Sequence, residues 1–352
     1  MNTKFIFFLV VVIFTISCSR TSTELPGKNY GQDGNDISYN LYVDKTGNIW
    51  SSGKDSRTID KLNYDFKVTE SIKRPGTANL ALVNDGTMWA FENYLLARSK
   101  DNGQTWECFS KSSFINCDKS VTEYNFQAIK SIVFNNGAYF LGTYDGIYRS
   151  LDNGDSWEKV YNGNQTGINH VFDMISHNGI VYASAQISSS NITYGIIETF
   201  DNGQSWKTLN VQYADADIPI YQFIGSSASK NIYAYVVPNI FLVNTGDEWK
   251  ILSYLPVNGS SGHEQCDFKF SVVPNGDLLA SCSIYTAKYE GGDFPTIRNK
   301  GAYLLKSSDG GKSWQEISIN DKVEFVLDMA ILPSGDLIAA TNLGIVNVDY
   351  NK

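Results

Sequence analysis

The apolar residues of this chain fall into short runs separated by polar turns, and the order of these runs repeats along most of the sequence. Residues 128–160 show one unit clearly. The runs AIKSIVFNN, AYFLGTY, IYRSL and SWEKVY follow one another, with turns at Gly137, at Asp145-Gly146 and at a longer polar segment between them. Short runs of β-branched and aromatic residues bounded by Gly, Asn and Asp are typical of strands in tight hairpins. The pattern predicts an all-β fold made of four-stranded antiparallel units.

The polar turn before the last run of a unit has a recurring sequence. Residues 99–106 read SKDNGQTW, and the pattern returns as SLDNGDSW, TFDNGQSW and SSDGGKSW at 150–157, 199–206 and 307–314. A decayed copy, NTGDEW, ends at Trp249. The aspartates of the first three copies are 51 and then 49 residues apart, a spacing that indicates propeller blades. The predicted structural residues of the full copies are Asp101, Trp106, Asp152, Trp157, Asp201, Trp206, Asp309 and Trp314.

The consensus of these turns, (S/T)-x-D-x-G-x-(S/T)-W, resembles the Asp-box, also called the bacterial neuraminidase repeat. The resemblance implies a β-propeller in which each box joins the third and fourth strands of a blade, on the outer rim and away from the ligand-binding face. The residue types suit a structural role. The Asp and the hydroxyl groups can bond to backbone amides, Gly supplies a positive φ, and Trp packs against the blade. We therefore expect the boxes to specify the fold rather than a catalytic or metal site.

Repeats of this kind allow the blades to be counted. The last unit ends after its third strand, so a segment before residue 38 is predicted to supply the missing outer strand and close the ring. We expect a seven-bladed propeller, while six or eight blades stay open because repeat decay blurs the first and last units. The seven units are 38–72, 78–109, 128–161, 168–209, 219–252, 267–317 and 324–349.

The N-terminal residues differ in character from the repeats. A positive charge at Lys4 precedes an apolar run at 5–16, which is too short to span a bilayer and suits the core of a signal peptide. The run leads into the sequence TISC, which resembles the lipobox of bacterial lipoproteins, although Thr departs from the usual Leu. The resemblance implies a diacylated Cys18 and anchoring in the bacterial cell envelope. We expect the outer membrane, with the side left open; an ordinary signal peptide with a chance cysteine is the alternative. The predicted segments are a signal peptide at 1–17, a flexible tether at 18–35 and a propeller domain at 36–352.

Composition limits the partners. The 352 residues carry a net charge of −9 and no stretch rich in Lys or Arg, whereas a surface for nucleic acid or anionic lipid needs a basic patch. We therefore expect no nucleic-acid partner and contact with the membrane only through the lipid anchor. We also expect a monomer. No cofactor is predicted.

The four remaining cysteines predict two disulfides, as is common in an exported chain. Cys108 and Cys117 lie close together across a loop. Cys266 and Cys282 flank the hairpin turn PNGD at nearly equal distances, so they should face each other across two antiparallel strands. We favour these two pairs over the other two pairings. The sequence has no CxxC motif or Cys/His cluster, so no metal site is predicted.

Asp-box propellers serve several functions, and this chain resembles sialidase-like, sortilin-like and photosystem-assembly-factor-like propellers. Sialidases need three converging arginines, the first of them in an Arg-Ile-Pro motif. Here Arg74-Pro75 is displaced by two residues from that place, and Arg98 and Arg149 belong to the rim beside the boxes. A triad would have to consist of Arg57, Arg74 and Arg298, which disfavours a sialidase. The xyloglucan-hydrolase type needs opposed carboxylates, and no motif selects them.

The ligand-binding face of a propeller is formed by loops between the second and third strands and by loops between blades. Two predicted loops of this kind are 110–127 and 284–301, and the second is the longest of the chain. Its aromatic and charged residues suit contact with a sugar or a protein, and a merely decorated surface loop is the alternative. The histidines are isolated and are expected to be surface or packing residues. The ligand-binding candidates are Tyr285, Tyr289, Phe294 and Arg298 on this loop, and Arg57, Glu92, Tyr144 and Asp145 elsewhere on the face.

These features predict an envelope-anchored, non-catalytic β-propeller that binds a glycan or a polypeptide. The alternative is an enzyme acting at the same face, either a glycoside hydrolase of the sialidase-like type or a polysaccharide lyase. No clear Arg-Ile-Pro motif and no His/Tyr pair on an inner strand can be read from the sequence, so no catalytic residue is assigned.

Overall fold

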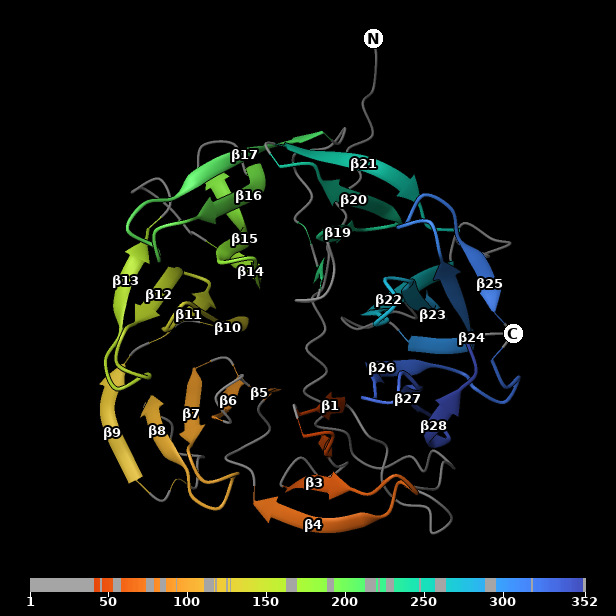
Figure 1. The fold of residues 1–352 in the computed structure, drawn as a ribbon, viewed down its shortest axis with the longest axis horizontal. Helices are drawn as coiled ribbons and strands as arrows, with labels where there is room; N and C mark the ends of the chain where they lie inside the picture. Colours follow the sequence, from red (N-terminus) through yellow and green to blue (C-terminus); the bar gives the residue numbers. More distant parts are fainter. Residues whose placement is uncertain are drawn as a thin grey trace.

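The computed structural model places the chain in a ring of β-sheets (Figure 1). Within its described ranges there is no helix long and apolar enough to cross a membrane. These ranges are 41–44, 46–52, 58–73, 79–82, 87–92, 94–110, 117, 119–124, 126, 128–162, 170–188, 193–212, 220, 222–225, 231–246, 248–256, 264–288, 296–317 and 319–350.

The strands form seven blades arranged around a central axis, and within each blade successive strands pair in antiparallel fashion from the inside outward, with one parallel exception in blade 2 (Figure 1). Blade 1 contains β1 (Leu41–Val43), β2 (Ile49–Ser52), β3 (Thr58–Leu62) and β4 (Val68–Lys73). Blade 2 contains β5 (Asn79–Leu82), β6 (Met88–Glu92), β7 (Leu95–Ser99), β8 (Glu107–Ser110) and β9 (Lys119–Tyr124). Blade 3 contains β10 (Ser131–Asn135), β11 (Ala138–Thr143), β12 (Gly146–Ser150) and β13 (Glu158–Tyr161).

The remaining four blades follow the same order. Blade 4 contains β14 (Val171–His177), β15 (Ile180–Ser188), β16 (Thr193–Thr199) and β17 (Lys207–Gln212). Blade 5 contains β18 (Gln222–Ile224), β19 (Tyr233–Val236), β20 (Ile240–Asn244) and β21 (Glu248–Tyr254). Blade 6 contains β22 (Glu264–Val272), β23 (Leu278–Lys288), β24 (Thr296–Ser307) and β25 (Gln315–Ile317). Blade 7 contains β26 (Val326–Ile331), β27 (Leu337–Thr341) and β28 (Gly344–Val348).

The predicted all-β propeller of seven blades is confirmed, with two differences at the outer edge. The predicted loop 110–127 contains β9, a fifth strand that runs parallel to β8 with Cys108 beside Ser120. In blades 4 and 5 the outer strands β17 and β21 pair in parallel, which joins the two blades into one eight-stranded sheet. The fourth strand predicted for blade 7, from a segment before residue 38, lies outside the described residues.

Seven hydrophobic clusters hold the ring together, and each lies between two neighbouring blades. Between blades 3 and 4, for example, Phe140 packs in one cluster with Val171 and Ile197. The cluster between blades 7 and 1 contains Leu41 and Ile338, which are almost three hundred residues apart in sequence. The ring is therefore closed by packing between its first and last blades.

The four (S/T)-x-D-x-G-x-(S/T)-W turns connect the third and fourth strands of blades 2, 3, 4 and 6 and share one hydrogen-bond pattern. The Ser99 hydroxyl donates to Asp101 at 2.8 Å and accepts from the Gly103 amide at 2.7 Å. Asp101 also accepts from the amide and hydroxyl of Thr105, at 2.9 and 2.6 Å. The same bonds recur around Asp152, Asp201 and Asp309.

Each of these turns docks on the preceding blade rather than on its own. A Cβ atom on Gly154 of blade 3 would lie 2.3 Å from Trp89 of blade 2, so only glycine fits this contact. The turn's tryptophan, Trp157, packs edge-on against Trp89 with ring centroids 5.8 Å apart. On the same side of the ring, Arg98 of blade 2 pairs with Asp155 in the turn of blade 3 at 2.6 Å. These contacts fix neighbouring blades to one another at the rim.

Two inner aspartates link blades nearer the axis. Asp173 on β14 accepts a hydrogen bond from the Phe223 amide of blade 5 at 2.7 Å, and Asp328 on β26 accepts one from the Leu41 amide of blade 1 at 2.8 Å. Each also accepts from the amide of the methionine that follows it. Burial raises the pKa of both carboxyl groups, that of Asp173 to about 7.

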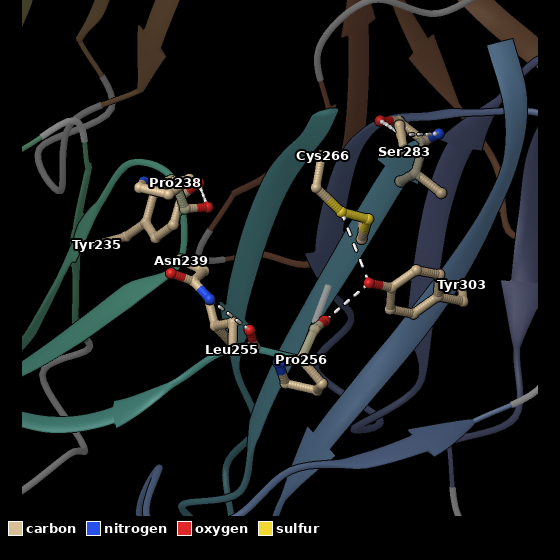
Figure 2. The surroundings of a disulfide bond; sticks show 10 residues. Tyr235, Pro238, Asn239, Leu255, Pro256, Cys266, Ser283 and Tyr303 are labelled. Atoms are coloured by element: carbon tan, nitrogen blue, oxygen red, sulfur yellow. Dashed lines mark hydrogen bonds between the residues drawn. A yellow bond between two sulfur atoms is a disulfide. The ribbon is translucent and has the colours of Figure 1, made fainter. Parts of the chain in front are cut away.

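Both favoured cysteine pairs lie at disulfide distance, with Cα atoms 6.0 Å apart for Cys108 and Cys117 and 5.4 Å apart for Cys266 and Cys282. The second pair is diagonal rather than directly opposite, because Cys266 faces Ile284 and Cys282 faces Phe268 in the ladder. It joins β22 to β23 (Figure 2).

Candidate functional site

The upper face of the ring is defined here as the face that carries the turns between second and third strands. Because the strands of a blade alternate in direction, this face lies opposite the Asp-containing turns described above. Among the described residues it includes Tyr94 of blade 2, Tyr144 and Asp145 of blade 3, and Pro238 of blade 5. It is the face on which the sequence placed the ligand-binding candidates.

A row of partly exposed side chains crosses this face from blade 3 to blade 4. The His170 ring stacks on the Tyr144 ring with centroids 4.0 Å apart, and the Lys130 ammonium lies 4.6 Å from the centre of the same tyrosine. Phe172 and Tyr194 continue the row, with ring centroids 5.2 Å apart. Burial lowers the pKa of His170, and the charge of Lys130 lowers it further, so both effects favour the neutral imidazole.

This row changes the interpretation of Tyr144. The ring was predicted to be available for a ligand, but its π-system already has an imidazole and an ammonium as partners. Sequence reasoning missed Lys130, His170, Phe172 and Tyr194. The signal that could have found them is the blade repeat, which brings the second turn of one blade next to the start of the first strand in the following blade.

Asp145 is also occupied within its own blade. Its carboxylate accepts hydrogen bonds from Lys159 at 2.7 Å, Thr143 at 2.8 Å and Tyr148 at 3.0 Å. Partial burial raises the pKa of Asp145, but these three donors outweigh the burial and hold the pKa below its usual value. Asp145 is therefore held in its ionised form and stabilises its own turn. This environment does not suit a residue that transfers protons.

The predicted loop 284–301 is a β-hairpin, which corrects the sequence-based interpretation. Strands β23 and β24 stay paired beyond the body of blade 6, with Tyr285 opposite Asn299 and Lys288 opposite Thr296. The segment TIR after the tip contains the β-branched residues Thr and Ile, which favour strands, whereas the segment TAK before it contains only one such residue. We call this extension, residues 284–288 and 296–301, the arm of blade 6.

The other predicted residues are described only in part. Tyr285 is partly buried on β23; burial raises its pKa, and the negative charge of Asp267 raises it further. Glu92 and Arg298 are placed only as backbone positions in β6 and β24. Arg57, Arg74, Tyr289 and Phe294 lie outside the described residues.

The described side chains do not converge on an obvious reaction centre. In the ranges given above, no three His, Cys, Asp or Glu side chains lie close enough to hold a metal ion. The inner aspartates Asp173 and Asp328 have raised pKa values, but both use their oxygens to link blades.

Comparisons with known proteins identify the fold and no family. No protein-family model matches the chain, and no curated protein sequence matches it. The extracellular domain of a one-component system from B. thetaiotaomicron is similar over 90% of this chain, with a TM-score of 0.59 and 9% identity; the match spans 39% of that protein.

Two complete propellers are also similar. Virginiamycin B lyase from Staphylococcus aureus, solved in an inactive form with quinupristin, matches 92% of this chain and 97% of its own, with a TM-score of 0.57 and 13% identity. YCF48 from Cyanidioschyzon merolae matches 88% and 94%, with a TM-score of 0.53 and 12% identity. One is a lyase and the other is not named as an enzyme, so these neighbours share a β-propeller fold and not one activity.

Proposed function

We propose that this chain is an exported, lipid-anchored binding protein of the Asp-box propeller type, and that it binds a polypeptide at its upper face without catalysing a reaction. The observation that carries the proposal is the arm of blade 6, where β22, β23 and β24 are longer than their counterparts in every other blade. Among the described residues, the hydrophobic clusters on either side of blade 6 reach Ile284 and Ala302, at the base of the arm.

A polypeptide suits the described surface better than a glycan. Sugars are commonly held by open aromatic faces together with free carboxylates. Here the Tyr144 ring already has His170 and Lys130 as partners, and the Asp145 carboxylate has three donors. The arm instead offers backbone groups along a sheet edge, which recognise extended peptides.

Export and anchoring are proposed from the chain itself. Disulfides persist in oxidising compartments, and two cysteine pairs lie at disulfide distance. The apolar run before Cys18 supplies the signal. Metabolic labelling with a palmitate analogue should tag the wild type and leave Cys18→Ser untagged, and equal labelling of the two would contradict the anchor.

The binding proposal can be tested with the full-length protein in detergent micelles. We expect it to enrich members of a displayed random-peptide library, to retain no member of a glycan array, and to release no product from a fluorogenic sialoside. Retention of glycans without enrichment of peptides would overturn the proposed ligand class. Turnover of the sialoside would revive the hydrolase alternative.

A variant locates the site. Replacing residues 286–299 by a short Gly-Ser turn should remove most of the peptide affinity while leaving the melting temperature nearly unchanged, because the replacement keeps every described member of the hydrophobic clusters of blade 6, including Ile284 and Ala302. The matched control is Leu151→Ser with Phe200→Ser, since both side chains are about three-fifths exposed on turns at the opposite face. If the control variant loses affinity and the arm variant keeps it, peptides bind at the face opposite the upper face and the proposed site is wrong.

A further inference from the structure

We infer that Lys130, Tyr144 and His170 bind a carboxylate group of the polypeptide ligand, and that Phe172 and Tyr194 contact an apolar side chain next to that group. The inference rests on the proposed function and names a chemical group that the upper face recognises. We call Lys130, Tyr144 and His170 the carboxylate cluster. All five side chains are partly exposed, and they belong to blades 3 and 4, which are neighbours in the ring (Figure 1).

The carboxylate cluster brings three hydrogen-bond donors to one aromatic ring. The Lys130 ammonium lies 4.6 Å from the centre of the Tyr144 ring, and the His170 ring stacks on the same tyrosine. Within the ranges that the structure describes, no hydrogen bond uses the ammonium, the Tyr144 hydroxyl or the His170 ring nitrogens. The faces of the rings are occupied, whereas their polar groups can still donate. An ammonium, a phenol and an imidazole together suit an anionic acceptor.

The surroundings of the cluster provide no carboxylate for these donors, although the chain has a net charge of −9. The segments at 163–169 and 189–192 flank the cluster in sequence; they read GNQTGIN and SSNI and contain no Asp or Glu. The two carboxylates closest to the cluster in sequence already have partners. Asp145 accepts from three donors of its own blade, and Asp173 accepts from two backbone amides. A positively charged group without an anion on a negative protein indicates that the anion comes from a ligand.

Lys130 and His170 influence each other electrostatically. Burial lowers the pKa of the His170 imidazole, and the positive charge of Lys130 lowers it further, with no described carboxylate to offset these effects. A carboxylate bound at the cluster would stabilise the protonated imidazole, because an opposite charge nearby favours the charged form. Binding should therefore raise the pKa of His170. Packing of the rings alone would give no such response to a ligand.

The corresponding turns of two other blades are tied to their own backbone. In blade 5 the Asn239 side chain donates to the Leu255 carbonyl at 3.2 Å. In blade 7 the Asn342 side chain accepts from the Glu324 amide at 2.8 Å and donates to the Lys322 carbonyl at 3.0 Å. These side chains satisfy their polar groups within the fold. The polar groups at the second turn of blade 3 are left for a partner of another kind.

Aromatic side chains extend the cluster on blade 4. The Phe172 ring lies edge-on to His170, with centroids 6.0 Å apart, and edge-on to Tyr194, with centroids 5.2 Å apart. Partly exposed aromatic rings beside a charged group suit a ligand that carries an apolar side chain next to its carboxylate. A polypeptide offers this combination where an apolar residue stands beside Asp or Glu, or at an apolar C-terminal residue. A uronic acid offers the carboxylate without the apolar neighbour.

The first test uses nuclear magnetic resonance on the full-length protein in micelles, with isotope-labelled histidine rings. The signal of His170 is identified by its loss in His170→Gln. We expect N-acetylphenylalanine, at concentrations up to about 10 mM, to shift this signal saturably and to raise the pKa of His170. The corresponding amide and glucuronate should produce little change. No response to N-acetylphenylalanine would overturn the inference, and an equal response to glucuronate would assign the site to an acidic sugar instead.

Variants of Lys130 separate binding from packing. Lys130→Gln should weaken N-acetylphenylalanine by at least roughly tenfold. It should also raise the pKa of His170 in the free protein, because it removes a neighbouring positive charge. Lys130→Arg keeps the charge and should keep most of the affinity. The matched control, Lys312→Gln, makes the same change of net charge at an exposed position of the opposite face and should alter neither quantity. Wild-type affinity of a folded Lys130→Gln protein, or an equal loss in the control, would refute the site.

Three labelled peptides of equal length identify the source of the carboxylate by fluorescence polarisation. One ends in Phe with a free carboxylate, the second ends in Phe amide, and the third carries an internal Phe-Asp pair and an amide end. The second peptide should bind at least roughly tenfold more weakly than the tighter of the other two, which shows whether a chain end or a side chain is recognised. Equal affinities of all three would contradict carboxylate recognition.

The displayed peptide library distinguishes failure of this inference from failure of the proposed function. Library peptides that bind the wild type and Lys130→Gln equally well would preserve the proposed function and refute the carboxylate cluster. Binding of N-acetylphenylalanine without enrichment of any peptide would support the carboxylate site and refute a polypeptide as the ligand.

Discussion

In this propeller, the role of a residue depends more on the groups that contact it than on its amino-acid type. Tyr144 and Asp145 are adjacent and were both candidates for contact with a ligand, yet one is held by a histidine and a lysine and the other by three donors of its own blade. The tryptophans of the Asp-containing turns behave in the same way. Trp157 is buried against Trp89 and Phe126 of the preceding blade.

Trp157→Ala should strongly destabilise the protein. The Trp157 indole N–H has no hydrogen-bond partner within the described structure, so its contribution is packing, and truncating a buried tryptophan costs about 3–5 kcal/mol. Chemical denaturation of the wild type and the variant measures this difference. Binding at the upper face by the fraction that stays folded should be unchanged.

The matched control lies in the same turn. Leu151→Ala removes an apolar side chain that is 60% exposed, and it should change the free energy of unfolding by no more than about 0.5 kcal/mol. If Trp157→Ala keeps the wild-type stability but loses binding, the turns have a functional role and their structural assignment is wrong.

At the scale of elements, the sequence predicts the inner strands of the blades well and their outer edges poorly. Runs such as IVFNN and AYFLGTY alternate around tight turns, and β10 and β11 begin and end within a few residues of the predicted limits. The inner strands are specified locally, because each one packs on both sides against neighbouring blades. The outer strands depend on partners that are distant in sequence.

Two outer elements illustrate the difference. β9 was predicted as part of a loop, because its pairing with β8 is parallel and leaves no hairpin signature in the sequence. The arm of blade 6 was predicted as a loop because its aromatic and charged residues resemble a binding loop, although IYTAK and TIRNK can also pair as strands. The position of an insertion in this blade was predictable, because Trp249 and Trp314 are 65 residues apart whereas the earlier repeats are about 50 residues long. The pairing of the inserted residues as strands was not predictable.

The candidate site was predictable in outline. The position of Tyr144 in a second turn follows from the repeat, whereas its contact with His170 joins two blades and depends on how they pack. The histidine was expected to be a surface or packing residue, and its ring does pack, on a tyrosine. A single sequence indicates which residues reach a face, and three-dimensional packing decides which of them remain available.

The whole molecule is a ring of seven blades joined by seven similar interfaces, and its stability depends on every interface staying intact. Six interfaces join blades that are consecutive in the chain. The seventh joins blade 7 to blade 1 through a hydrophobic cluster and the hydrogen bond from the Leu41 amide to Asp328. Asp173 makes the equivalent bond between blades 4 and 5. A buried aspartate therefore accepts a backbone hydrogen bond both between two consecutive blades and between the last blade and the first. The dependence of stability on pH can test the contribution of these two aspartates.

These aspartates predict a ring that weakens as the pH rises from about 4 to about 7. Burial raises the folded-state pKa of Asp173 to about 7, above the 3.8 of the ordinary carboxyl group, so the folded state holds more protons than the unfolded state between these values. Its contribution to stability is full below pH 4 and is lost as the pH rises through 7. Asp328 shifts in the same direction.

Asp173→Asn and Asp328→Asn should each cost about 1–3 kcal/mol at pH 5, because the amide can replace only one of the two oxygens that accept backbone N–H groups. The difference in stability from the wild type should narrow as the pH is raised to 8, since the wild type alone loses the proton-linked stability.

Asp201→Asn is the control. Hydrogen bonds led by that from Ser205 lower the pKa of Asp201 to about 2, so its effect should stay constant between pH 5 and pH 8. Melting temperatures measured across this range check all three variants. A gap for Asp173→Asn that stays constant or widens toward pH 8 would contradict the proton linkage and leave the blade-to-blade hydrogen bonds as the sole contribution of these residues.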